Sequence, residues 1–375
     1  MLNISDWPPG DEKKVFNYLQ WSSYRSERYK LFYVSTPKVA CTSLKWWFAS
    51  LEGCAKALST IVDSAESDPD QVVHELHKVA PHITGLSPEE LSEALTSDEY
   101  FRFAVVRNPY KRIFSAWQSK LLLQEPQQIG PYLQRDFFHQ PLRNAGDISL
   151  AFEGFLEHLA SQEAPSYWDQ HWTPQAVLLR PDLINYTKLV RIEESAELSE
   201  ALSERLGEYI PDPFAERRAN ESLIPYLPEF VTKRSESLIR TLYAEDFDVF
   251  GYDTQLPHSK EVFSEEELHL ALRAIKLIRG RHQRLGERTA QLGVLSEKVA
   301  GLEVQIANFN VATSERDAQI AQLGHLVVER ETKITQLSHC VVDLEGQVDH
   351  LNLNASVVEY DQKISDLSHA LVERD

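Results

Sequence analysis

The sequence predicts an α/β fold in which a parallel β-sheet is flanked by helices and followed by a long C-terminal coiled-coil helix. Strand-like apolar runs alternate with amphipathic helical runs up to about residue 258. After Pro257 there is no proline or tryptophan, and the composition becomes that of a long helix, rich in Glu, Gln, Leu, Val and Arg. An apolar heptad pattern runs through that helix. We therefore divide the chain into a domain of residues 1–258 and a coiled-coil segment of residues 259–375.

The first domain is expected to alternate strands and helices. The predicted strands are KLFYVS (30–35), YFRFAVV (100–106) and TKLVRIE (187–193), and the predicted helices cover 43–51, 110–123, a segment that ends before Gly207, and about 228–243. Strands that alternate with helices imply a parallel sheet. Open sheets of this kind bind ligands beyond the carboxyl ends of their strands, so the turns after Ser35 and Val106 are the candidate sites.

The first of these turns, 36-TPKVACTS-43, joins a strand to a helix. Backbone N–H groups at the start of that helix would point toward an anion, with hydroxyl donors from Thr42 and Ser43 and with Lys38 within reach of a group being transferred. The turn lacks the glycines of a Walker loop, G-x-x-x-x-G-K-[ST], and its lysine comes early, after Pro37. On spacing alone, an anion site and an ordinary strand–helix connection both remain open.

The second turn, 107-RNPYKRIFSAW-117, follows a buried strand and places three cations within six residues of an acidic chain. Arg107 stands at the end of the strand, where a fork of guanidinium donors can grip a phosphate, and Ser115 follows one to two helical turns later and could share it. The alternative is an amphipathic helix whose basic residues face water. That alternative accounts for Lys111 and Arg112, but it explains Arg107 poorly.

The C-terminal segment keeps one heptad register for about ten repeats. With Leu292 at position a, the a positions are mostly Leu, Val and Ile and the d positions mostly Leu, as far as Val358. A strict seven-residue repeat predicts a left-handed coiled coil, and β-branched residues at a with leucine at d favour a parallel dimer. Arg316 and Arg330 interrupt the d series. A solvated single helix is the alternative, but it has no reason to keep such a seam, so we expect a homodimer.

Composition excludes several classes of protein. The chain of 375 residues has a formal net charge of −19, which argues against a general nucleic-acid binder. Its three cysteines, Cys41, Cys54 and Cys340, are scattered and suggest neither a disulfide framework nor a zinc site. The N-terminus has no signal-peptide pattern and no stretch of about 18 apolar residues occurs, so we expect no membrane span and a cytoplasmic location.

Together, the two turns resemble motifs of the carbohydrate sulfotransferases of the chondroitin/HNK-1 type. TPKVACTSLKWW is similar to that family's P-K-V-x-C-T-x-x-K loop, and RNPYKRIFSAW is similar to its R-x-P-x-x-R-x-x-S-A-[YW] element. Weaker matches follow in the expected order: HWTP (171–174), KLVRIEE (188–194) and LYAEDFDVFGYD (242–253). The resemblance covers about residues 31 to 253 and does not include the coiled-coil segment.

The resemblance implies a fold related to the P-loop nucleotide kinases. It also implies transfer of a sulfuryl group from 3′-phosphoadenosine 5′-phosphosulfate (PAPS) to a hydroxyl of a cell-surface or capsular glycan, with adenosine 3′,5′-bisphosphate (PAP) as the product. The residues implied for the 5′-phosphosulfate are Pro37, Lys38, Val39, Ala40, Cys41, Thr42, Ser43 and Lys45, and those implied for the 3′-phosphate are Arg107 and Ser115. Lys38 would stabilise charge on the bridging oxygen as PAP leaves. Because a sulfuryl group carries less charge than a phosphoryl group, we expect no metal requirement.

A general base must take the proton of the acceptor hydroxyl. Related enzymes often place a histidine or glutamate between the two donor motifs, where this chain has 74-HELHKVAPH-82. We prefer His82 as the base, with His77 and then His171 as the other candidates, although each of them alone could simply pack or cap a helix. A metal cluster of His74, His77 and His82 is a further alternative.

Other features are interpreted by position. Residues 124–150 have little pattern and are assigned as a lid or acceptor site, and the arginines of ERRANES (216–222) could reach the adenine or the 3′-phosphate. Cys41, three residues after Lys38, could be a thiol nucleophile, although the family pattern makes it a small residue behind the loop. The animal enzymes of this type are Golgi membrane proteins with disulfides, whereas this chain resembles a soluble bacterial relative of them.

Two other functions compete with sulfuryl transfer. A nucleotide kinase-like phosphotransferase would need glycines in the loop and a carboxylate for magnesium, and the sequence offers neither. A catalytically inactive coiled-coil scaffold would have no need for the intact set of Lys38, Arg107 and Ser115.

Overall fold

The centre of the fold is a four-stranded sheet with the order β1-β2-β3-β4, in a computed structural model that describes residues 12–58, 60–61, 69–162, 168–207, 213–214, 222–259 and 262–372. The strands are β1 (Ser23–Ser26), β2 (Leu31–Val34), β3 (Phe101–Val106) and β4 (Lys188–Arg191). β2, β3 and β4 are parallel, with Tyr33 opposite Phe103 and Ala104 opposite Leu189. The three strands predicted from the sequence are therefore confirmed.

β1 makes the sheet mixed rather than purely parallel, which corrects our prediction. It runs antiparallel to β2, with Ser23 opposite Val34. Its sequence, SYRS, has a single apolar residue, so a search for apolar runs does not find it. Arg25 is nevertheless buried, because its guanidinium donates to the Tyr100 hydroxyl at 2.7 Å and to the Glu93 carboxylate at 2.8 Å. Pairing of a buried charge therefore allows this polar segment to form an edge strand.

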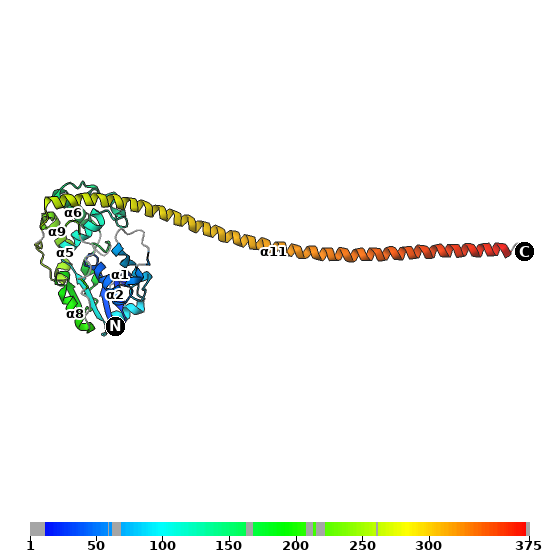
Figure 1. The fold of residues 1–375 in the computed structure, drawn as a ribbon, viewed down its shortest axis with the longest axis horizontal. Helices are drawn as coiled ribbons and strands as arrows, with labels where there is room; N and C mark the ends of the chain where they lie inside the picture. The colour runs from blue at the N-terminus through cyan, green and yellow to red at the C-terminus, as the bar shows by residue number, and fades with distance from the viewer. Residues whose placement is uncertain are drawn as a thin grey trace. The chain divides into compact units, whose positions relative to one another are not determined.

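Helices pack around the sheet (Figure 1). The longer ones are α1 (Glu12–Ser22), α2 (Cys41–Leu51), α4 (Pro88–Thr96), α5 (Pro109–Trp117), α6 (Ala145–Ala160), α8 (Ala196–Leu206), α9 (Lys233–Leu242) and α11 (Glu265–Val372). The short helices and turns are α3 (Ala55–Leu58), η2 (Pro69–Lys78), η3 (Gln118–Leu122), η4 (Gly130–Tyr132), η5 (Asp136–His139), α7 (Gln175–Leu179), η7 (Ile192–Glu194), η8 (Pro228–Phe230) and α10 (Ala244–Val249).

Helix ends coincide with local signals in the sequence. Asn108 caps α5, because its side-chain oxygen accepts from the Tyr110 N–H at 3.1 Å, and Pro109 occupies the first helical position. α8 ends at Gly207, whose φ of 64° places it in the left-handed region, as the predicted end requires. α5 is followed directly by η3, a π-helical turn that the sequence did not indicate.

Alternating side chains of the strands pack into two apolar clusters, which include residues from different helices. Tyr33 and Phe103 stack, with 5.2 Å between ring centroids, in the cluster that α2 and η2 complete. Phe32 and Ala104 belong to the other cluster, which residues of α1 and α4 complete. Because residues next to one another in a strand point to opposite faces, both faces of the sheet are covered, as expected for parallel strands. A third cluster joins α5, α6 and α9 beside the sheet.

The first turns of α11 belong to the same compact unit as the sheet. The chain divides into one unit of residues 1–290 and a second of residues 291–375. Ile275 is 2% exposed within the cluster of α5, α6 and α9. Arg279 donates to the Leu122 carbonyl at 2.7 Å, and His282 donates to the Leu123 carbonyl at 2.8 Å. The change of composition near residue 258 therefore does not coincide with the end of this unit.

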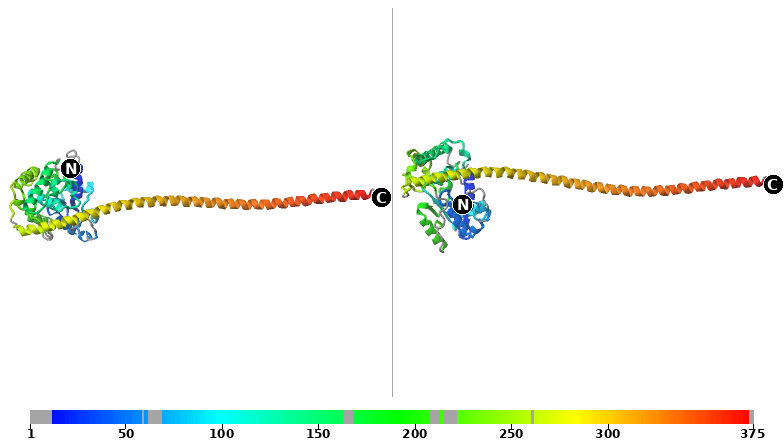
Figure 2. Two further views of the ribbon diagram at one scale, coloured as in Figure 1. Left: turned by 90° about the horizontal axis from the view of Figure 1, so that it is seen from above. Right: turned by 45° about the horizontal axis from the view of Figure 1, so that its top comes forward.

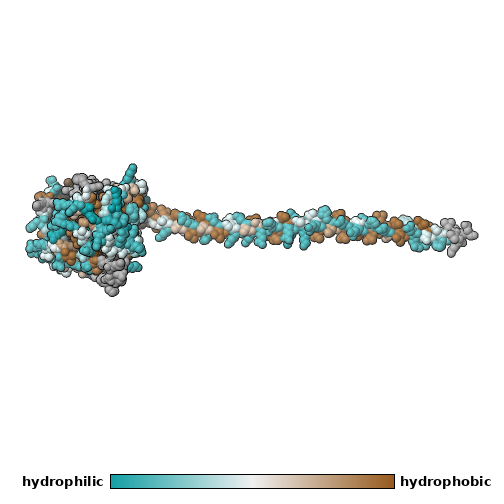
Figure 3. All heavy atoms as spheres, turned by 90° about the horizontal axis from the view of Figure 1, so that it is seen from below, coloured by the Kyte–Doolittle hydropathy of each residue, from teal (hydrophilic) through white to brown (hydrophobic). Residues whose placement is uncertain are grey.

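The second unit is the remainder of α11, and it is helical to Val372, as predicted (Figure 2). Its a and d side chains are exposed in the single chain; Leu292 is 56% and Ile320 is 66% exposed. Apolar residues recur among polar ones along the helix (Figure 3). The parallel coiled-coil dimer itself stays a prediction. No described helix is long and apolar enough to cross a bilayer.

Candidate active site

The loop between β2 and α2 takes a backbone conformation for which glycine is usually needed. Lys38 and Ala40 have φ angles of 68° and 48°, both in the left-handed region. This region costs a non-glycine residue about 1–2 kcal/mol, and residues held in it cluster at active sites and ligand clamps. The loop therefore makes the tight bends of a phosphate-binding loop although it contains no glycine.

The first turn of α2 begins at this loop. Its N-cap is Ala40, which has no side-chain oxygen to accept from the N–H groups that follow. Thr42 and Ser43 lie in the same turn and are buried. Because a helix N-terminus offers N–H donors and a partial positive charge, this turn favours a bound anion.

One cavity of about 1030 Å³ brings together most of the residues that the sequence singled out. Those that line it are Pro37, Lys38, Ala40, Cys41, Thr42, Ser43, Lys45, Arg107, Ser115 and His171. Val39 is not among them, because its side chain is buried in the apolar cluster under the loop. The charged residues of the lining are Lys38, Lys45, Arg107, Lys111, Lys120, Glu75, Glu125 and Glu193. The cavity is therefore a locally basic site in an acidic chain.

Arg107 is held at the end of β3 through its backbone and its side chain. Its backbone N–H donates to the Gln175 side-chain oxygen at 2.8 Å, and its carbonyl accepts from the Gln175 amide nitrogen at 2.9 Å. Gln175 in turn donates its backbone N–H to the buried carboxylate of Asp246 at 2.9 Å. The Arg107 guanidinium donates to the Lys38 carbonyl at 3.1 Å, so the two predicted turns are tied together.

Arg112 is buried and holds the loop between β2 and α2 through hydrogen bonds. The amphipathic-helix alternative placed it in solvent, but it is 1% exposed, so that interpretation is wrong for this residue. Its guanidinium donates to the carbonyls of Pro37 at 3.1 Å, Gln170 at 3.1 Å and Thr173 at 2.8 Å. Arg112 therefore fastens the loop to the segment that contains His171.

Lys38 is the cation of the loop, and its surroundings lower its pKa to about 8. Burial is the main cause, since it disfavours the charged form, and the charge of Lys120 adds to it. Arg107 acts in the same direction, whereas Glu125 opposes it. An anion bound in the cavity would favour the ammonium form again.

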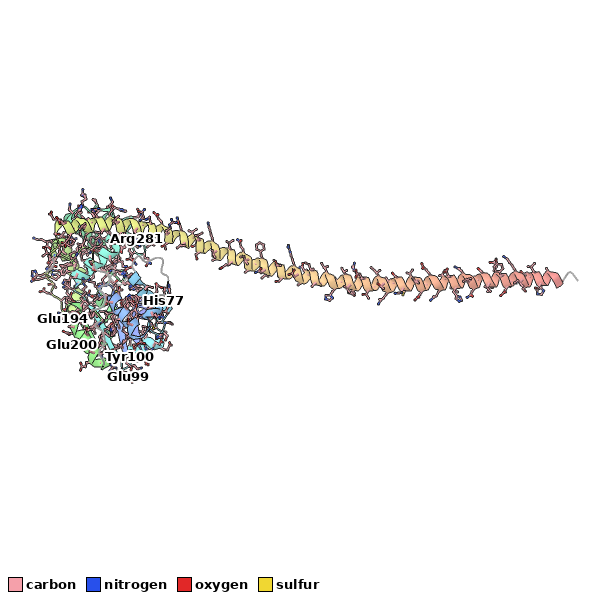
Figure 4. The ribbon with its side chains drawn as sticks, viewed as in Figure 1. His77, Glu99, Tyr100, Glu194, Glu200 and Arg281 are labelled. Atoms are coloured by element: carbon pink, nitrogen blue, oxygen red, sulfur yellow. The ribbon has the colours of Figure 1, made fainter. Side chains whose placement is uncertain are left out.

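The structure separates the candidate bases. His171 lines the cavity, whereas His77 and His82 do not. His77, labelled in Figure 4, packs edge-on against Trp21 with 5.5 Å between ring centroids, and His82 is exposed. Across the described ranges, no group of three His, Cys, Asp or Glu residues is arranged to hold a metal ion, so the structure does not support the alternative of a cluster of His74, His77 and His82.

His171 has the arrangement of a proton acceptor. Its Nδ1 lies 2.6 Å from Asp169 Oδ1, and its backbone N–H donates to the same oxygen at 2.8 Å. Burial works against ionisation of Asp169, but the side-chain and backbone hydrogen bonds from His171, together with the charges of His171 and Lys120, outweigh it and lower the pKa of the carboxyl. Because a carboxylate only accepts, Nδ1 carries the hydrogen and Nε2 keeps its lone pair. Burial lowers the pKa of His171 to about 4, so the ring is neutral at pH 7.

His74 lines the same cavity with the opposite arrangement. Its Nδ1 lies 2.8 Å from the ammonium of Lys45, which is 8% exposed and does not face water as the sequence allowed. An ammonium only donates, so Nδ1 of His74 accepts and Nε2 carries the hydrogen. The adjacent Lys45 charge holds the pKa of His74 well below its ordinary value. His74 is therefore a hydrogen-bond donor rather than a base.

Sequence reasoning did not identify a charged pair that lines the cavity. Lys120 of η3 and Glu125 form an ion pair at 2.5 Å, and both line the cavity. A helix interpreted with a regular period gives no sign of the π-helical turn that carries Lys120. Residues 124–150 contribute Glu125, Gln127 and Gln128 to the lining, and their role as a lid stays a prediction. The arginines of the 216–222 segment lie outside the described residues.

The sequence is similar to those of curated carbohydrate sulfotransferases. Carbohydrate sulfotransferase 10 of Xenopus laevis is 27% identical over 245 residues, which are 60% of this chain and 66% of that protein. Carbohydrate sulfotransferase 14 of Homo sapiens is 25% identical over 260 residues, which are 66% of this chain and 63% of that protein. The chain thus spans about two thirds of the length of the curated relatives that it matches. No solved structure matches it significantly.

The strongest of these findings is a match to a family model. The model described as "Sulfotransferase family" matches residues 21–253, which is more than half of the chain. The matched region contains β1 to β4, both turns of the cavity and the buried Asp246 that positions Gln175. The chain therefore belongs to the sulfotransferase family.

Proposed function

We propose that the chain transfers a sulfuryl group from PAPS to a hydroxyl of a carbohydrate by in-line transfer. The observation that carries this proposal is the single cavity in which the loop of residues 37–43 meets Arg107 and Ser115. Two anion-binding elements in one cavity suit a donor with a 5′-phosphosulfate and a 3′-phosphate. The names of the relatives, carbohydrate sulfotransferases, supply the reaction and the class of acceptor.

The residues of the cavity fit this donor. The N–H groups of the first turn of α2 and the hydroxyls of Thr42 and Ser43 would hold the 5′-phosphate, and Arg107 and Ser115 would hold the 3′-phosphate. Ligand cavities commonly measure about 300–1,000 Å³, so a cavity of about 1030 Å³ is large enough for a nucleotide. The strand–loop–helix order around Lys38 also supports a fold of the P-loop nucleotide-kinase type.

Lys38 would stabilise the charge that develops on the leaving phosphate. When bound, the donor supplies an activated sulfuryl group. The Lys38 ammonium is poorly solvated in the cavity, so it would bind the bridging oxygen more strongly as negative charge grows there. Because a sulfuryl group carries less charge than a phosphoryl group, we assign this neutralisation to side chains and to no metal ion.

We assign the general base to His171 and no longer to His82. His171 lines the cavity, its ring is neutral at pH 7, and its hydrogen bond to Asp169 leaves Nε2 as the acceptor. Asp169 would also stabilise the imidazolium that forms when His171 takes the acceptor proton. His171→Ala should therefore lower kcat with little change in PAP affinity.

The acceptor is proposed to be a cell-surface or capsular glycan, and the proposed location is the cytoplasm. The printed names of the relatives support the class of acceptor. The three cysteines are free in the structure, which is usual in a reducing compartment.

We further propose that α11 pairs with a second copy in a parallel coiled coil. The support is the unbroken heptad register, whose a and d side chains are about half exposed or more in the single chain, Leu344 at 58% for example. Burial of such a seam between two helices is the usual source of coiled-coil stability.

Calorimetry with the full chain and PAP tests the donor site, and absence of binding would refute the proposal. Incubation with radiolabelled PAPS and a glycan extract tests the transfer. Lys38→Ala should leave PAP binding largely intact, because Arg107, Ser115 and the first turn of α2 would still hold its two phosphates, and it should abolish turnover. Retained turnover would remove Lys38 from its role.

A further inference from the structure

The proposed function assigns no role to Lys120, a cation of the cavity lining. Lys120 lines the cavity with Lys38, and its side chain is 14% exposed. Its ammonium has three hydrogens, and within the described part of the chain the carboxylate of Glu125 accepts one of them, at 2.5 Å. An ammonium with so little contact with water needs further acceptors, which a bound anion would supply.

The charge of Lys120 affects the pKa of a residue on the donor side, Lys38, and of a residue on the acceptor side, His171. After burial, it is the next cause that lowers the pKa of Lys38 on the donor loop. Together with burial, it also lowers the pKa of His171, which we propose as the base for the acceptor. In an in-line transfer the leaving oxygen and the acceptor oxygen lie on opposite sides of the sulfur. Lys120 lines the same cavity as Lys38 and His171, so its ammonium is placed to reach the sulfuryl oxygens that would lie between them.

The backbone that carries Lys120 is held by the first turns of α11. The Arg279 guanidinium donates to the Leu122 carbonyl and His282 to the Leu123 carbonyl, at 2.7 Å and 2.8 Å. The Glu125 N–H donates to the Lys120 carbonyl at 2.9 Å, so the counter-ion is fixed to the same turn. A charge positioned in advance by such supports needs little reorganisation during a reaction.

We propose that Lys120 is a second catalytic residue, which binds the non-bridging oxygens of the sulfuryl group while Lys38 binds the bridging oxygen. This inference rests on the proposed function. In the step, the bond between sulfur and the phosphate oxygen breaks and its electron pair stays on that oxygen. A bond forms between sulfur and the acceptor oxygen, whose proton passes to His171. Lys120 forms no covalent bond, and Glu125 holds its ammonium in place when no donor is present.

Binding of PAPS and PAP without acceptor tests this role directly, because the two ligands differ only in the sulfuryl group. Lys120→Met should weaken PAPS binding by about 10- to 100-fold, the range for loss of a hydrogen bond to a charged group, and should change PAP binding by less than about twofold. Lys188→Met is the matched control, since Lys188 pairs with Glu197 at 2.8 Å outside the cavity, and it should change neither. Glu125→Gln should keep the preference for PAPS, because Lys120 remains.

Turnover gives the second readout. Lys120→Met should lower kcat by about 10²- to 10³-fold, as loss of one transition-state donor does. Equal PAPS-to-PAP affinity ratios in Lys120→Met and wild type would overturn the inference, and so would an equal loss of PAPS and PAP binding, because the effect would then be on the whole site. If the wild-type chain binds no PAP, the proposed function fails; if it binds PAP and Lys120→Met behaves like Lys188→Met, only this inference fails.

Discussion

Replacing Lys38 with methionine should stabilise the ligand-free protein although it should abolish activity. Lys38 is half-buried in the wall of the cavity, and loss of solvation of its ammonium is the main reason that its pKa falls from 10.5 to about 8. A lowered lysine pKa means that the native state holds the charged form less favourably than the unfolded chain does. Methionine has a similar length and never carries a charge, so it removes this cost.

The magnitude follows from the two pKa values. The difference between 10.5 and about 8 corresponds to about 3 kcal/mol. Below pH 8 both states are protonated and the full cost is present. Between pH 8 and 10.5 the native state releases its proton first, so the unfolded state binds more protons and wild-type stability rises with pH. The advantage of Lys38→Met should therefore be largest below pH 8 and should fall toward its pH-independent part near pH 10.5.

Urea unfolding followed by tryptophan fluorescence measures this effect in the full chain. All seven tryptophans precede residue 258, so the signal reports the unit that holds the sheet and not the rest of α11. Wild type, Lys38→Met and the control Lys188→Met would be compared without ligand at several values between pH 7 and 10.5. A stability difference between wild type and Lys38→Met that does not change with pH, or a less stable Lys38→Met at pH 7, would refute the reasoning.

The other predictions concern the donor site, the domain boundary and the coil. Arg107→Ala should weaken PAP binding by about 10- to 100-fold in calorimetry, because its charge-assisted contacts are lost, and an unchanged affinity would remove Arg107 from the site. A chain that ends at Ala290 should keep the urea midpoint of the full chain. One that ends at residue 258 should lose about 2–5 kcal/mol or more, since it lacks the buried Ile275, and equal midpoints would contradict this. Light scattering at micromolar concentration should give the mass of a dimer, and a monomeric mass would exclude the coiled coil.

Predictions from the sequence were most accurate where hydrophobic pattern decides the structure. Three parallel strands, the helix end at Gly207 and the long helix α11 all follow from apolar periodicity and local signals. β1 was missed because its burial depends on the charged partners of Arg25, which lie far away in the sequence, such as Glu93. Arg112 was misjudged for the same reason, since the carbonyls that satisfy it belong to loops that only the folded chain brings near.

The residues of the candidate site could also be predicted only where a local sequence pattern identifies them. The two turns could be identified because each has its residues within one short segment, and the structure places most of those residues in one cavity. The base could not be chosen from the sequence, since His77, His82 and His171 differ only in their surroundings in the folded chain. Lys120 could not be assigned to the site from the sequence, because it lies in a π-helical turn that shifts the helix period by one residue. No side-chain pattern in the sequence predicts such a turn.

Because the Arg112 guanidinium is buried, the presence of Arg112 in a relative of this chain does not show that the relative is active. It stands in the middle of the second motif, yet its partners are three backbone carbonyls of the chain itself, including that of Pro37. A descendant that lost its activity would still need Arg112 in order to fold, and so would still match the motif. Pseudoenzymes in this family should therefore be sought by the loss of Lys38, whose removal is predicted to make the fold more stable, and not by the loss of the motif.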